Sequence, residues 1–143
     1  MIPKILRLQS LEKYRDFGAL FLRLVVGAFL VYGTQDNVFS FARMKEFEHF
    51  LAARGVPVPL LAAFVSAYAQ FVCGILFIFG AATRAAAVVM IINFVAALLI
   101  AHRGDSFQGM LAALMMLASA FFFLLHGAGK PSVDEGLGTS RRP

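Results

Sequence analysis

Long apolar stretches alternate with short polar segments along this chain. The apolar stretches cover residues 17–33, 59–82, 85–101 and 106–126. A helix needs about 20 apolar residues to cross the hydrocarbon core of a bilayer, which is about 30 Å thick. Because each stretch reaches or closely approaches that length, the pattern predicts four transmembrane helices.

The polar segments predict how these helices connect. Residues 81–84 separate the second stretch from the third, and residues 102–105 separate the third from the fourth, so both pairs should be antiparallel neighbours. The first connection, residues 34–58, is longer, and residues 39–54 within it mix apolar and charged side chains at helical spacing. We therefore expect an all-α, transmembrane antiparallel four-helix bundle with an extra amphipathic helix in the first extracytoplasmic loop.

Composition supports this fold class and suggests three regions. Of the 143 residues, 60% are hydrophobic and the mean hydropathy is +0.79, so too little polar sequence remains to cover four such helices in water. Residues 17–126 should form the transmembrane domain. Residues 1–16 are basic and lack the apolar core of a signal peptide, and residues 2–13 suit a short interfacial helix or a frayed end equally well. Residues 127–143 should form a cytoplasmic tail, with the last seven residues disordered.

Lysine and arginine predict the orientation of the bundle. Four spans place both ends of the chain on one side of the membrane. The basic residues expected on that side are Lys4, Arg7, Lys13, Arg15, Arg84, Lys130, Arg141 and Arg142. Those expected on the opposite side are Arg43, Lys45, Arg54 and Arg103. This bias predicts that both termini lie in the cytoplasm. Because the basic residues flank the predicted spans, the net charge of +5 does not indicate nucleic-acid binding.

One arginine and two side-chain amides inside the predicted spans are candidates for a functional site. Arg23 is within the first span, and Gln70 and Asn93 lie near the middle of the second and third spans. Because the second and third helices should be antiparallel neighbours, the two amides fall at a similar depth, and in this hypothesis Arg23 joins them in one polar cluster. Such a cluster is either an interhelical hydrogen-bond clamp or a binding site for a small polar head group, such as a quinone ring.

The remaining reactive residues form no recognisable catalytic or metal-binding pattern. His49, His102 and His126 are scattered, and the single cysteine, Cys73, lies within the second span. The sequence contains no Gly-rich phosphate loop, nucleophile triad or pair of catalytic carboxylates. We therefore expect no metal site and no catalytic activity from the chain alone.

Glycines, polar residues and one proline recur within and between the spans in a distinctive order. They are Arg23, Gly27, Gly33, Gly55, Pro57, Gly74, Gly80, Thr83, Arg84, His126, Gly129, Lys130, Ser132 and Asp134. This pattern, over about residues 17–137, resembles the DoxX family of small four-helix membrane proteins. One departure concerns Gln70, which stands where the family is expected to carry an intramembrane glutamate. An amide cannot ionise, so this position cannot relay protons as a carboxylate would.

The resemblance implies a function in the bacterial inner membrane. Some DoxX proteins resemble the small subunit of a thiosulfate:quinone oxidoreductase, and others are associated with membrane complexes that handle oxidative stress and thiols. We expect a non-catalytic subunit or partner of a quinone-linked or redox-protective assembly, embedded in the lipid bilayer as a homo-oligomer or beside other membrane subunits. Two alternatives stay open: a quinone-binding oxidoreductase subunit, with quinone as its cofactor, and a small transporter.

Overall fold

The structure, a computed structural model, describes residues 9–139, and all regular elements in that range are helices. The prediction of an all-α chain is confirmed for this range. The elements are a 3₁₀-helix η2 (Gln9–Tyr14), α1 (Arg15–Phe39), α2 (Phe41–Ala53), α3 (Pro59–Phe79), α4 (Thr83–Ala96), a short π-helix η3 (Ala97–Ala101), α5 (Phe107–His126) and α6 (Val133–Thr139).

Four helical segments within the described range are long and apolar enough to cross a membrane. They are Ser10–Phe39, Pro59–Phe79, Thr83–Ala101 and Phe107–His126. Large apolar side chains on these segments face outward; Phe21 is 71% exposed and Leu125 is 79% exposed. Such helices, apolar on the outside as well as toward the core, are typical of membrane spans. The prediction of a four-span membrane protein is therefore confirmed by length and composition.

Helix α1 extends farther than the sequence predicted, to Phe39 rather than to residue 33. The hydroxyl of Thr34 donates to the carbonyl oxygen of Leu30 at 2.7 Å, so this buried polar side chain is satisfied within the helix. Ser40 then ends α1 and caps α2, because its hydroxyl accepts a hydrogen bond from the backbone N–H of Arg43 at 3.4 Å. A helix thus occupies most of the first connection, and its amphipathic role at the membrane surface stays a prediction.

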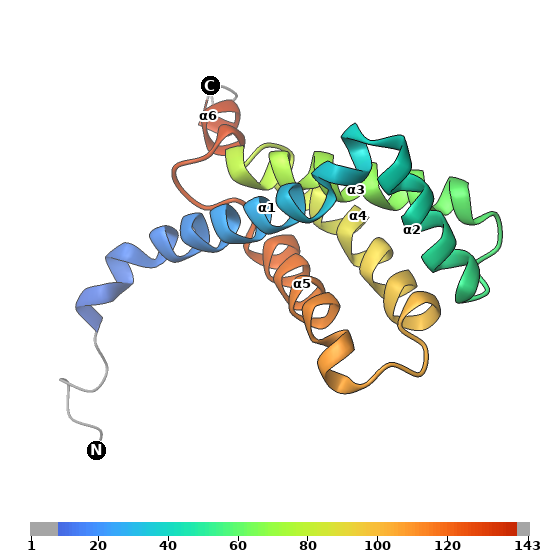
Figure 1. The fold of residues 1–143 in the computed structure, drawn as a ribbon. Coiled ribbons are helices and arrows are strands. Elements are labelled where there is room, and N and C mark those ends of the chain that lie inside the picture. Colours follow the sequence, from blue (N-terminus) through green and yellow to red (C-terminus); the bar gives the residue numbers. More distant parts are fainter. Residues whose placement is uncertain (1–8, 140–143) are drawn as a thin grey trace, which may run out of the picture.

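The spans pack as two helix pairs. Helix α1 lies along α3, and α4 pairs with α5 (Figure 1). Gly27 and Gly74 are both buried where α1 meets α3, and their lack of side chains lets the two backbones touch. Phe77 of α3 meets Phe123 of α5 in the core, with 4.8 Å between their ring centroids. The antiparallel order of the spans across a bilayer stays a prediction.

The C-terminal segment packs against the bundle. The carboxylate of Asp134 accepts hydrogen bonds from the backbone N–H groups of Ala82 and Thr83, at 2.6 and 2.9 Å, and its own N–H donates to the carbonyl of Gly80 at 2.9 Å. Helix α4 has no side-chain cap from its own N-cap residue, so this distant carboxylate satisfies its first N–H groups. The prediction of a disordered end is wrong for residues 137–139, which complete α6. The remaining residues of that prediction, and residues 1–8, lie outside the described range.

Candidate functional site

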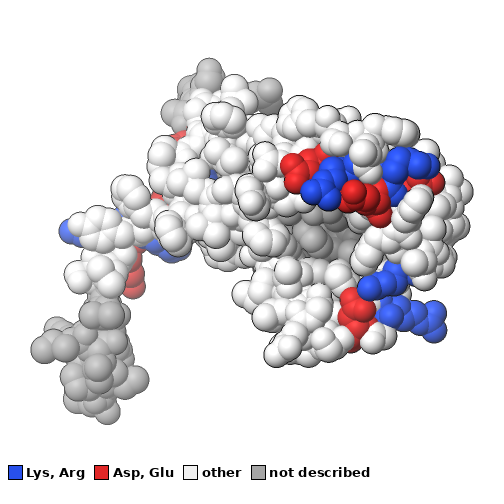
Figure 2. Space-filling model, in the orientation of Figure 1, with Lys and Arg blue, Asp and Glu red and all other residues white. Residues whose placement is uncertain are grey.

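A cavity of about 640 Å³ lies between the helices, and Gln70 and Asn93 both line it. All five helices from α1 to α5 contribute to its wall. Figure 2 shows this face of the molecule hollowed between α2 and the α4–α5 pair, with charged side chains bordering the hollow. Its main apolar lining residues are Phe29, Phe47, Phe50, Ile92, Phe94 and Met116, and its polar ones are Thr34, Asn37, Ser66, Gln70, Asn93 and His102.

The two amides differ in their hydrogen bonding. The Nε2 atom of Gln70 donates to Ser66 Oγ at 3.0 Å, one turn earlier on α3. The Nδ2 atom of Asn93 is buried and has no hydrogen-bond partner among residues 9–139. A buried donor left without a partner costs about 1–3 kcal/mol. The Asn93 amide is therefore available to a hydrogen-bond acceptor that enters the cavity.

Arg23 lies apart from this cavity. Its side chain is almost fully buried, with 1% exposure, and its Nη2 atom donates to the carbonyl oxygen of Pro131 at 2.7 Å. Side chains on a helix lean toward its N-terminus, so the long arginine reaches back to the end where α1 begins. The structure thus brings Gln70 and Asn93 to one cavity and separates Arg23 from them. The ligand-binding role of these residues stays a prediction.

Charged residues close the cavity near the end of η3. His102 lines the cavity, and its Nδ1 atom lies 2.9 Å from Asp105 Oδ2. Arg54, the C-cap residue that follows α2, donates to the carbonyl of Ala101 and, at 3.3 Å, to Asp105 Oδ2. The hydrogen bond with His102, and after it the hydrogen bond and the positive charge of Arg54, hold the pKa of Asp105 below its usual range. This arrangement fastens α2 over the cavity.

The sequence offered only a weak signal that His102, Asp105 and Arg54 would meet. His102 and Asp105 are three residues apart in the connection after the third span, but Arg54 is 51 residues from Asp105. The π-helix η3 was not predicted either, because its hydrogen bond from His102 N–H to Ala97 O depends on local helix widening. Single turns of π-helix occur often at functional sites.

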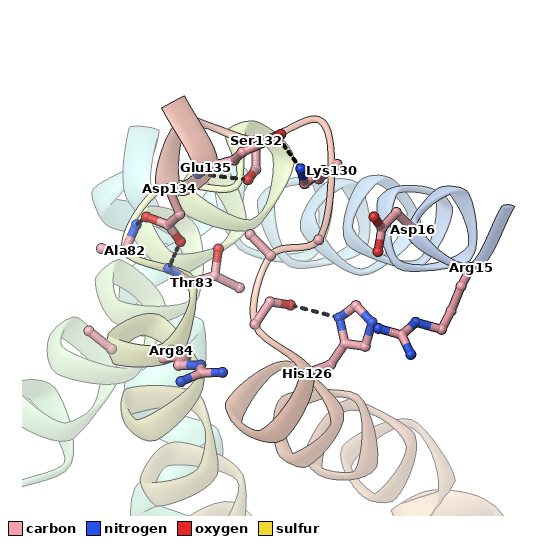
Figure 3. A pocket seen from close by; sticks show the side chains of 14 residues that line it. Arg15, Asp16, Ala82, Thr83, Arg84, His126, Lys130, Ser132, Asp134 and Glu135 are labelled. Carbon is pink, nitrogen blue, oxygen red and sulfur yellow. Dashed lines mark hydrogen bonds and ion pairs between the residues drawn. The ribbon is translucent and has the colours of Figure 1, made fainter. Parts of the chain in front are cut away.

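A second pocket, of about 650 Å³, lies at the opposite end of the bundle. Figure 3 shows Arg15 and Asp16 of α1, Arg84 of α4 and His126 of α5 around it, beneath the loop that carries Lys130. These residues appeared in the sequence as flanking charges or as parts of motifs, so their convergence was not predicted.

Comparison with known proteins gives a family but no closer relative. A family model described as DoxX matches residues 18–103, which is more than half of the chain. The matched range runs from α1 through η3 and includes Arg23, Gln70 and Asn93. No curated protein and no solved structure matches the chain.

Proposed function

Because this chain belongs to the DoxX family, we propose that it is a non-catalytic membrane subunit of a quinone-linked or redox-protective assembly. In this proposal it holds a quinone, or a similar amphiphile, in the cavity beside Gln70 and Asn93. The single observation that carries the proposal is this cavity, which reaches both amides from among the membrane-spanning helices.

The size and lining of the cavity favour an amphiphile with a polar ring. Pockets for small molecules commonly measure about 300–1,000 Å³ and combine apolar walls with a few placed polar groups. The unpaired Nδ2 of Asn93 would donate to a ring carbonyl. The side-chain oxygen of Gln70 would accept from a ring hydroxyl, because its Nε2 is already directed to Ser66.

Arg23 has a different role in this proposal. It holds the C-terminal segment through Pro131 and thereby stabilises the bundle rather than touching the ligand. Gln70 gives the site a neutral amide in the middle of the membrane. The site would therefore bind the ring without exchanging protons at that position.

Changes to the lining of the cavity should weaken quinone binding. In lipid nanodiscs, calorimetric titration with a short-tailed ubiquinone analogue should give a lower affinity for Asn93→Leu by about fivefold, because one net hydrogen bond of about 1 kcal/mol is lost. Ala97→Phe should weaken binding by at least about tenfold, because its ring occupies part of the cavity.

Two matched variants control this experiment. Gln108→Leu removes an exposed amide outside the cavity, and Ala118→Phe adds a ring on the exposed face of α5. Both should bind the analogue like the unmodified protein. If the unmodified protein shows no saturable binding, or if Ala97→Phe binds as tightly as Ala118→Phe, the proposed site is refuted.

We also propose that the chain resides in a bacterial inner membrane with both termini in the cytoplasm. Lysine and arginine are more numerous in the terminal segments and the connection between the second and third spans, which share one side of the membrane, and this excess supports the orientation. A green fluorescent protein fused to the C-terminus should fluoresce, and alkaline phosphatase fused there should be inactive, because it needs disulfides that form in the periplasm. Fusions that replace the chain after Gly104 should give the reverse pattern. The opposite result at both positions would refute the orientation.

A further inference from the structure

The ends of three spanning helices place basic groups around the second pocket. Arg15 begins α1, Arg84 lies in the first turn of α4, and His126 ends α5. All three line the pocket of about 650 Å³, and Figure 3 shows their side chains extending into the space beneath the loop. Because the ends of membrane-spanning helices lie near the bilayer surface, four spans in a bilayer would bring this pocket to the level of the lipid headgroups.

Neighbouring contacts neutralise some of the charges in this pocket. Lys130 forms an ion pair with Glu135 at 2.9 Å. The carboxylate of Asp134 is engaged by the backbone N–H groups at the start of α4. What remains is a basic wall formed by Arg15, Arg84 and His126, faced by one carboxylate, Asp16.

The basic wall retains donors for a ligand. The one hydrogen bond that Arg84 makes among residues 9–139 is long, at 3.4 Å from its Nη2 atom to the carbonyl of Leu125. Within the same range Arg15 forms no ion pair and is exposed. Thr83 is fully buried at the pocket wall, and its hydroxyl has no hydrogen-bond partner in the described part of the chain.

We propose that this pocket binds the phosphate of a phospholipid headgroup, with Arg15, Arg84 and His126 facing the phosphate. Basic pockets between membrane-spanning helices are known to bind lipid headgroups. Asp16 would meet a cationic amine on the same headgroup, so a phosphoethanolamine group fits the mixed charge of the pocket better than phosphoglycerol. Inorganic phosphate shares part of this chemistry, and the position at the ends of the spans favours the lipid.

Native mass spectrometry tests this assignment. The full-length protein is prepared in detergent with equal amounts of phosphatidylethanolamine and phosphatidylglycerol, with and without excess inorganic phosphate. The unmodified protein should retain phosphatidylethanolamine in preference, and inorganic phosphate should not displace it. Arg84→Gln and Arg15→Gln should each lower the bound fraction by about fivefold, because each removes one cation near the headgroup. Asp16→Asn should remove the preference for the ethanolamine lipid while leaving phospholipid bound.

Arg103→Gln is the matched control, since it removes an exposed arginine at the opposite end of the bundle and outside this pocket. It should retain lipid like the unmodified protein, and thermal unfolding of every variant should confirm that the fold is intact. Equal lipid retention in Arg84→Gln, Arg15→Gln and Arg103→Gln would overturn the site. Displacement of the lipid by inorganic phosphate would overturn the lipid assignment. Neither result bears on quinone binding in the other cavity.

Discussion

Gly27→Ala is expected to push α1 away from α3 and to destabilise the bundle. A Cβ atom at Gly27 would lie 2.6 Å from the carbonyl oxygen of Gly74 and 3.1 Å from the backbone nitrogen of Ile78. Backbone atoms cannot move aside as a flexible side chain does, so the helices themselves must shift. We expect a loss of about 1–3 kcal/mol in the free energy of unfolding, as is common when a tight core is overpacked.

Gly18→Ala is the matched control for Gly27→Ala. Both glycines lie in α1, but a Cβ atom at Gly18 would meet no atom within 4 Å. Alanine is a better helix former than glycine by about 0.5–1 kcal/mol, so Gly18→Ala should be neutral or slightly stabilising.

Cys73 provides the measurement. It is the single cysteine and is buried, with 4% exposure, so a thiol-reactive dye labels it when the protein unfolds. The midpoint of thermal unfolding in detergent should fall for Gly27→Ala and stay unchanged or rise for Gly18→Ala. Equal midpoints for the two variants would show that the backbones of α1 and α3 do not touch at Gly27.

Gly80→Ala is expected to release the C-terminal segment from the bundle. Gly80 follows α3 with a φ of +64°, which L-residues with a side chain rarely adopt. A Cβ atom there would also lie 2.6 Å from Ser132 Cβ and would collide with the guanidinium of Arg23. The left-handed conformation costs about 1–2 kcal/mol, and the collision adds about 1–3 kcal/mol.

Gly55→Ala separates these two costs. Gly55 has a φ of +73°, but a Cβ atom there would meet no atom within 4 Å, so this variant carries the conformational cost alone. Limited digestion with a glutamate-specific protease should cleave Gly80→Ala at Glu135, in α6, faster than Gly55→Ala. The Cys73 dye should also report a lower unfolding midpoint for Gly80→Ala. Similar cleavage and similar midpoints would contradict the packing of Arg23 and Ser132 against Gly80.

The helix boundaries were largely readable from local sequence signals. Helix α3 begins at Pro59, because proline suits the first turn of a helix, and ends before Gly80, which takes the left-handed cap conformation. The end of α1 was missed because residues 34–37 are polar. The helix continues through them, and the Thr34 hydroxyl is satisfied by the helix itself.

The candidate site was predictable in part. Gln70 and Asn93 were placed at the same depth from the short connection between their helices, and both do line one cavity. Their hydrogen bonding was not predictable, because it depends on how each helix is rotated. The sequence did not predict the contacts among His102, Asp105 and Arg54. They form because α2 folds back over the cavity and brings Arg54 to the distant connection after η3.

The sequence by itself determined that this is a helical membrane protein with four spans, because a bilayer demands about 20 apolar residues per helix and leaves no unpaired backbone groups. The tertiary structure decided which polar residues meet. Arg23 bonds to Pro131 across 108 positions, and Asp134 caps a helix that begins 51 positions earlier. Such contacts depend on helix rotation and side-chain reach, which local apolar periodicity does not encode.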